Sequence, residues 1–101
     1  MLKLKIKKLS NIEKIVGLIF AKKPYSIYFK TRFGIHTFGM KFPIDVIILN
    51  KANRVVKMNQ NMKPNKIYFW PIIYEDVLEL PQGMILTNNI AIGQQIELVF
   101  I

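Results

Sequence analysis

The stretch HTFGMKFPIDVIILN, residues 36–50, decides how this chain folds. Its second half, from Ile44 to Leu49, is an apolar run interrupted by Asp45 alone. A run of this kind is typical of a strand covered on both faces, because a strand with one wet face alternates apolar and polar residues. We therefore expect residues 44–50 to form a central strand.

The first half of this stretch carries polar groups and a turn. Pro43 favours an extended conformation before it and ends a hydrogen-bond ladder. If residues 41–43 were the loop of a simple hairpin, Asp45 would lie on the face opposite to His36. A bulge at Pro43 would shift the register by one residue and bring the two side chains together. Both registers stay open at this point.

Further strands are expected on both sides of this centre. Residues 1–9, MLKLKIKKL, alternate apolar residues with lysine at period two, which predicts a strand with one buried face. Tracts rich in β-branched and aromatic residues predict others. Together with an extended segment at 35–40, the expected strands lie at 1–9, 25–30, 44–50, 55–59, 76–80 and 95–100. Residues 68–76 are interpreted as a hydrophobic connection broken by Pro71.

Helical signals are few. Ser10 and Glu13 form a capping box ahead of apolar residues at helical spacing, which predicts a helix over about 11–20. A short helical turn is expected within 84–90. The predicted fold is therefore a small, mostly β single domain of the α+β class over residues 1–101. It has about six strands in a barrel-like sheet and one or two short helices.

Composition narrows the class of protein. The chain has 101 residues, of which 51% are hydrophobic, so it can bury one modest core. It has no cysteine and one histidine, which excludes disulfides, thiolate nucleophiles and thiolate metal sites. Neither an export signal nor a run long enough to span a membrane is recognised, and a cytoplasmic location is expected.

Charge is polarised along the chain. The net charge is +9, all 15 Lys and Arg residues lie before residue 67, and the remainder carries four carboxylates. Such a field attracts phosphate backbones, anionic lipid or an acidic protein, although lysine also solvates exposed strands and blunts sheet edges. Thirteen of the cations are Lys, which argues against base-specific readout because bidentate recognition favours Arg.

The order of motifs resembles the DUF192 (UPF0127) family of uncharacterised proteins. The motifs that carry the resemblance are GLIF (17–20), HTFGMKFPIDV (36–46), RVVKM (54–58), VLELPQGM (77–84) and Gly93. The resemblance implies a compact α+β domain with a small barrel-like sheet, and it implies no particular activity. Gly39 stands where the family usually has an aromatic residue, and Gln94 stands where it often has Asp.

The signature stretch also holds the candidate site. In the structural interpretation, His36 is a half-buried sheet residue and Asp45 accepts hydrogen bonds from backbone N–H groups near the turn. In the functional interpretation they line a ligand pocket, or act as a base and its orienting carboxylate, with no obvious nucleophile to complete a catalytic set. The expected ligand-binding residues are His36, Phe38, Met40, Lys41, Asp45 and Trp70.

No catalytic residue, metal or cofactor is expected. Glu75, Asp76 and Glu79, with Asp45, match no known cation-binding loop, and the alternation around Glu79 predicts an outward strand residue. Exposed aromatic residues can stack bases or sugars, but they also close small cores.

The expected function is therefore that of a non-enzymatic binding module, with a small polar or carbohydrate-like ligand in a cleft near His36 and Asp45. Nucleic-acid binding through the Lys-rich surface is the alternative, and a weak hydrolase comes third. The expected partners are an unknown small ligand and, as alternatives, nucleic acid or an acidic partner.

Overall fold

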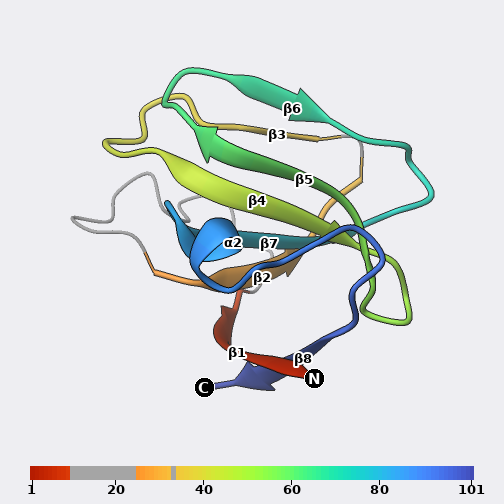
Figure 1. Ribbon diagram of the computed structural model, residues 1–101. Coiled ribbons are helices and arrows are strands. Elements are labelled where there is room, and N and C mark those ends of the chain that lie inside the picture. Colours follow the sequence, from red (N-terminus) through yellow and green to blue (C-terminus); the bar gives the residue numbers. More distant parts are fainter. Residues whose placement is uncertain (10–24, 33) are drawn as a thin grey trace.

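The computed structural model describes residues 1–9, 25–32 and 34–101. Six strands in this part of the chain form one mixed sheet in the order β5-β4-β7-β2-β1-β8, which curls into a half-barrel (Figure 1). These strands are β1 (Leu2–Lys8), β2 (Ile27–Lys30), β4 (Ile44–Leu49), β5 (Val55–Met62), β7 (Asp76–Pro81) and β8 (Ile96–Phe100). A second, two-stranded sheet joins β3 (Gly34–His36) to β6 (Ile67–Phe69), and α2 (Met84–Thr87) is a short helix. The predicted fold class is confirmed.

Strand β4 is the centre of the large sheet. It pairs antiparallel with β5 on one edge and with β7 on the other, and all six of its residues are buried. Its side chains alternate between two cores. Ile47 and Leu49 point into one core, which also holds Ile85 of α2, and Val46 points into another, which also holds Trp70. The prediction of a strand covered on both faces is therefore confirmed.

We call these clusters the α2-side core and the β3–β6-side core. The α2-side core consists of Leu4, Ile6, Tyr28, Ile47, Leu49, Val55, Leu78, Leu80, Ile85, Ile90 and Ile96. The β3–β6-side core consists of Leu9, Ile27, Phe29, Met40, Ile44, Val46, Ile48, Met62, Trp70 and Val77.

Strand β1 illustrates how period-two patterning selects one face. Leu4 and Ile6 are buried in the α2-side core, whereas Lys3, Lys5 and Lys7 are exposed. The strand runs parallel to β2 and to β8, so the first and last strands of the chain lie side by side (Figure 1). The predicted strand at residues 1–9 is confirmed.

Three expectations need correction or restriction. Tyr68 and Phe69, which were expected in a hydrophobic connection, belong with Ile67 to strand β6, because these three residues pair with β3. Glu79 was expected to face outward but is buried, because both faces of β7 are covered. The helix expected over 11–20 lies outside the described residues. In the part of the chain that the structure describes, no helix has the length and apolar character needed to cross a membrane.

Candidate ligand-binding face

The small β3–β6 sheet has one covered face and one open face. Ile35 lies opposite Tyr68, and both pack against the β3–β6-side core. The residues that alternate with them, His36, Ile67 and Phe69, are exposed. Because His36 lies directly opposite Ile67, these side chains form a continuous surface on the side away from the core.

The ring of Phe38 extends this surface. Phe38 is 47% exposed, and its ring stacks on that of His36 with centroids 5.0 Å apart and planes inclined by 26°. The backbone N–H of Phe38 also donates to Nδ1 of His36 over 3.3 Å. The two rings therefore form one preset unit. We call His36, Phe38, Ile67 and Phe69 the outer face.

Gly34 explains how Phe69 lies on this face. Phe69 is directly opposite Gly34 and is 64% exposed. A Cβ atom at Gly34 would come within 2.8 Å of Phe69 Cδ1 and 2.4 Å of the Tyr68 carbonyl oxygen. Only a residue without a side chain permits this approach, so the Phe69 ring lies close against the backbone of β3.

Thr37 anchors the turn that carries Phe38. Its side chain is fully buried, and its hydroxyl donates to the Lys63 carbonyl oxygen over 2.7 Å and accepts from the Lys66 N–H over 2.9 Å. The Thr37 N–H donates in turn to the Lys66 carbonyl oxygen. These bonds bring the backbone of exposed Lys63 and Lys66 next to the turn that carries Phe38.

Asp45 has a structural task. It is fully buried, and its Oδ1 accepts from the Asn61 N–H while its Oδ2 accepts from the N–H groups of Gly83 and Ile85, over 2.9 to 3.1 Å. The β4–β5 register shifts between Ile44 and Val46, so Asp45 bridges this irregularity to the start of α2. The interpretation of Asp45 as an acceptor for backbone N–H groups is confirmed.

His36 and Asp45 do not form a dyad. The hairpin that would have paired residue 36 with β4 is replaced by the pairing of β3 with β6, so neither register considered for Pro43 describes the fold. His36 is exposed and contacts Phe38, whereas the carboxylate of Asp45 is occupied by three backbone groups. Geometry therefore offers no oriented general base in this stretch.

The other expected site residues divide between core and surface. Met40 and Trp70 are buried in the β3–β6-side core, and Lys41 is exposed. The Trp70 indole N–H donates to the Tyr74 carbonyl oxygen over 2.9 Å. Thus His36, Phe38 and Lys41 are accessible from solvent, Met40 and Trp70 belong to the β3–β6-side core, and Asp45 is bonded to Asn61, Gly83 and Ile85.

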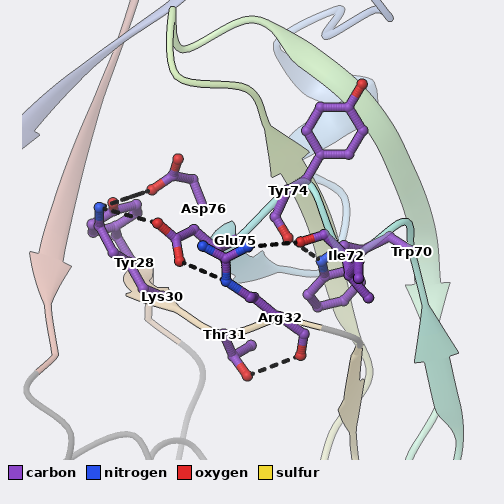
Figure 2. A network of polar contacts seen from close by, with 9 residues as sticks. All are labelled: Tyr28, Lys30, Thr31, Arg32, Trp70, Ile72, Tyr74, Glu75 and Asp76. Atoms are coloured by element: carbon purple, nitrogen blue, oxygen red, sulfur yellow. Dashed lines mark hydrogen bonds and ion pairs between the residues drawn. The ribbon is translucent and has the colours of Figure 1, made fainter.

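A polar network braces the connection that follows β6 (Figure 2). Arg32 Nε lies 3.4 Å from a Glu75 oxygen, and Arg32 Nη1 donates to the Ile72 carbonyl oxygen over 3.2 Å. Lys30 contacts both Glu75 and Asp76, and the Tyr28 hydroxyl donates to Asp76. Burial, followed by the hydrogen bond to Asp76, raises the pKa of the Tyr28 hydroxyl above its usual range. Glu75 and Asp76 are thus engaged in bracing the fold.

Two buried groups carry unusual protonation properties. Burial raises the pKa of Glu79 to about 7, and burial raises the pKa of Tyr68 to about 12. The Tyr68 hydroxyl is buried without a hydrogen-bond partner in the described residues, while the Lys57 ammonium lies 4.8 Å from the centre of its ring. Among these residues, no group of three or more His, Asp or Glu side chains could hold a metal ion.

The site residues expected from the sequence lack three residues of this region, Thr37, Ile67 and Phe69. Phe69 was considered only as one of several aromatic residues that stack bases or sugars or close a small core, and no role was assigned to Ile67. Ile67, Tyr68 and Phe69 do not alternate with charged or strongly polar residues, so the sequence does not indicate which side of this strand meets solvent. The pairing of Gly34 with exposed Phe69 is a signal for this face, but it can be recognised only when the β3–β6 register is known.

The curled six-stranded sheet with its small second sheet defines the class: a small, mostly β domain of the half-barrel type. The chain belongs to the DUF192 family, described as uncharacterised ACR, whose model matches residues 10–98. The resemblance of the signature motifs is therefore confirmed.

Solved structures share this fold. A protein of unknown function from Novosphingobium aromaticivorans DSM 12444 is 18% identical, with a TM-score of 0.74, over 89% of this chain and 70% of its own. A protein from Sinorhizobium meliloti 1021, described in its title as a "putative transcription regulator", is 14% identical, with a TM-score of 0.76, over 89% of this chain and 76% of its own. No curated protein matches the chain significantly. These likenesses establish the fold.

Proposed function

We propose that this protein is a non-enzymatic binding module, and that its ligand presents a ring to His36 and Phe38 on the outer face. The observation that carries the proposal is the exposed, preset stack of these two rings within the family's signature stretch. An aromatic ring held in place in advance stacks on a ligand with little loss of conformational freedom. Small polar ligands with a sugar or heterocyclic ring satisfy this requirement.

The polar groups beside the stack favour a ligand that is not purely apolar. The Nδ1 atom of His36 accepts from the backbone, which directs the opposite edge of the imidazole outward. Lys41 supplies an exposed ammonium group after the turn. Asp45 does not contact the ligand in this proposal, because its oxygens are already bonded to backbone N–H groups.

The test is a ligand screen with a panel of neutral monosaccharides, disaccharides and nucleosides. A ligand should raise the melting temperature of the parent protein and shift the amide resonances of residues 36–38 and 67–69. His36→Ala and Phe38→Ala should each abolish both effects without lowering the melting temperature of the free protein substantially, because both side chains are exposed.

Phe100→Ala is the matched control. Phe100 is 51% exposed, close to the value for Phe38, but it lies on β8 at the far edge of the large sheet. Ligand-induced shifts that survive in Phe38→Ala, or that disappear equally in Phe100→Ala, contradict the assignment of the outer face. Trp70, the single tryptophan, reports on the fold of each variant by its fluorescence.

A further inference from the structure

We infer that the ligand of the outer face is single-stranded nucleic acid, with bases stacked on Phe38 and Phe69 and phosphates held by the neighbouring lysines. This inference rests on the proposed binding face and names the ligand that it takes. It depends on three observations: the exposed rings, the positive charge of the segment that carries them and the close approach of Phe69 to β3 that Gly34 permits.

The rings are spaced along a sheet surface, as stacking on successive bases requires. The Phe38 ring extends the His36 end of the β3–β6 pair, and Phe69 lies at the other end, opposite Gly34. Between them His36 lies opposite Ile67. Unpaired bases stack on aromatic side chains of this kind whatever their sequence, because every base has a π face.

Gly34 allows the Phe69 ring to approach the backbone of β3 closely. The Cδ1 atom of Phe69 is 2.8 Å from the position that a Cβ atom at Gly34 would take. At the same time, 64% of the surface of Phe69 is exposed. An aromatic residue exposed to this extent offers surface on which a base can stack.

The segment that contains the outer face is strongly positive. Residues 34–70 contain six Lys or Arg residues, and Asp45 is their one carboxylate. Asp45 is fully buried and bonded to three backbone N–H groups, so it offers no anionic surface. The exposed cations of this segment are Lys41, Lys51, Arg54, Lys63 and Lys66, with Lys57 half-buried.

Contacts place three of these cations next to residues of the outer face or its turn: Lys57, Lys63 and Lys66. The backbones of Lys63 and Lys66 bond to Thr37, next to Phe38. At the other end, the Lys57 ammonium donates to the Phe69 carbonyl oxygen over 2.7 Å. A neutral sugar gains nothing from these positive charges. A phosphate backbone that binds to them releases its counterions, which favours binding.

The same features favour a single strand over a duplex. Bases within a duplex are stacked on each other, so their faces cannot reach Phe38 or Phe69. Lysine contacts phosphate as a point charge and reads base edges less well than arginine, so little sequence preference is expected. An acidic protein would use the charge but not the exposed ring faces.

The test is fluorescence anisotropy of the full chain with a short fluorescein-labelled oligothymidylate, its duplex with oligoadenylate as competitor, and a salt titration. The single strand should bind at low salt, more tightly than the duplex, and affinity should fall steeply with salt. Phe38→Ala and Phe69→Ala should each weaken binding by about tenfold or more without changing the salt dependence. Lys66→Ala should reduce the salt dependence.

Phe100→Ala again serves as the matched aromatic control and should bind as the parent does. Phe38→Leu keeps an apolar side chain but removes the ring, so it should behave as Phe38→Ala does. Equal binding of duplex and single strand, or unchanged affinity in both Phe38 variants, overturns the inference and leaves a purely electrostatic surface.

Failure of this inference is distinguishable from failure of the binding face. If the oligonucleotide does not bind but a neutral ring ligand shifts residues 36–38, the face stands and its nucleic-acid ligand is wrong. If neither binds, both are wrong. Capture by phosphatidylserine vesicles without binding to the oligonucleotide identifies a membrane-contacting surface and also overturns the inference.

Discussion

Glu79 lies directly opposite Val46 in the β4–β7 pair. On its other side, Ile27 of β2 is its direct neighbour. The carboxyl group is thus placed between two apolar side chains of the β3–β6-side core, and Glu79 is only 4% exposed. Removal from water disfavours the carboxylate and raises the pKa of Glu79 to about 7 from an ordinary value of 4.5.

We predict that this group makes the protein less stable as pH rises from about 4.5 to about 7. Below pH 4.5 the group is protonated in both the folded and the unfolded state, and its contribution is constant. Between the two pKa values the unfolded state releases the proton while the folded state retains it, which favours unfolding. The full difference is about 3 kcal/mol, and above pH 7 it stops growing.

Urea denaturation of the parent protein and of Glu79→Gln across this pH range measures the effect. Glu79→Gln should remove the slope, so that it gains stability over the parent as pH rises. Glu97→Gln is the control, because Glu97 is exposed and contacts Lys3 on the surface. A difference between parent and Glu79→Gln that does not depend on pH would show that Glu79 has an ordinary pKa.

The contrast between β4 and β7 shows how far the sequence predicts this fold. The apolar run of β4 implies cover on both faces, and that prediction is correct. In β7, Leu78, Glu79 and Leu80 alternate, which predicts one wet face, yet all three are buried. Alternation indicates which residues share a face, but only tertiary packing decides whether that face meets water.

The candidate site was less predictable because it depends on pairing between distant segments. The stack of His36 on Phe38 is local and lies within the signature stretch. The partner strand β6 comes from residues 67–69, and three apolar residues contain no information on which strand they join. His36 and Phe38 were therefore predictable from the signature stretch. Ile67 and Phe69 could be placed on the outer face only once the β3–β6 register was known.

Asp45 is predicted to be essential for stability. Asp45→Ala leaves three backbone N–H groups, one of them buried at Ile85, without their acceptor and should cost about 3 kcal/mol in the free energy of unfolding. Asp45→Asn keeps one acceptor oxygen and should lose less. Urea denaturation checks both variants, and a cost below about 1 kcal/mol for Asp45→Ala would mean that water or a rearranged loop replaces the carboxylate.

Thr37 is predicted to hold the turn through its hydroxyl. Thr37→Val preserves the shape of the side chain but removes the bonds to Lys63 and Lys66, and it should cost about 1 to 3 kcal/mol. Thr37→Ser retains the hydroxyl and should cost less. Thermal unfolding gives the stability of each variant, and equal losses in the two would show that the methyl group, and not the hydroxyl, is responsible.

Gly34 is predicted to be required for the pairing of β3 with β6. In Gly34→Ala the new Cβ would be 2.4 Å from the Tyr68 carbonyl oxygen and 2.8 Å from Phe69 Cδ1. Since the first contact is with backbone, the strands must separate, and we expect a loss of about 1 to 3 kcal/mol. Amide hydrogen exchange should become faster in residues 34–36 and 67–69 before it changes in β4.

The double variant Gly34→Ala with Phe69→Ala separates the two contacts. Truncating Phe69 removes the clash with its ring but leaves the clash with the Tyr68 carbonyl, so stability should not be restored. Full recovery in the double variant would mean that the aromatic ring alone demands glycine. In that case the backbone of β3 and β6 has room for a side chain, and Gly34 serves the close placement of Phe69 against β3.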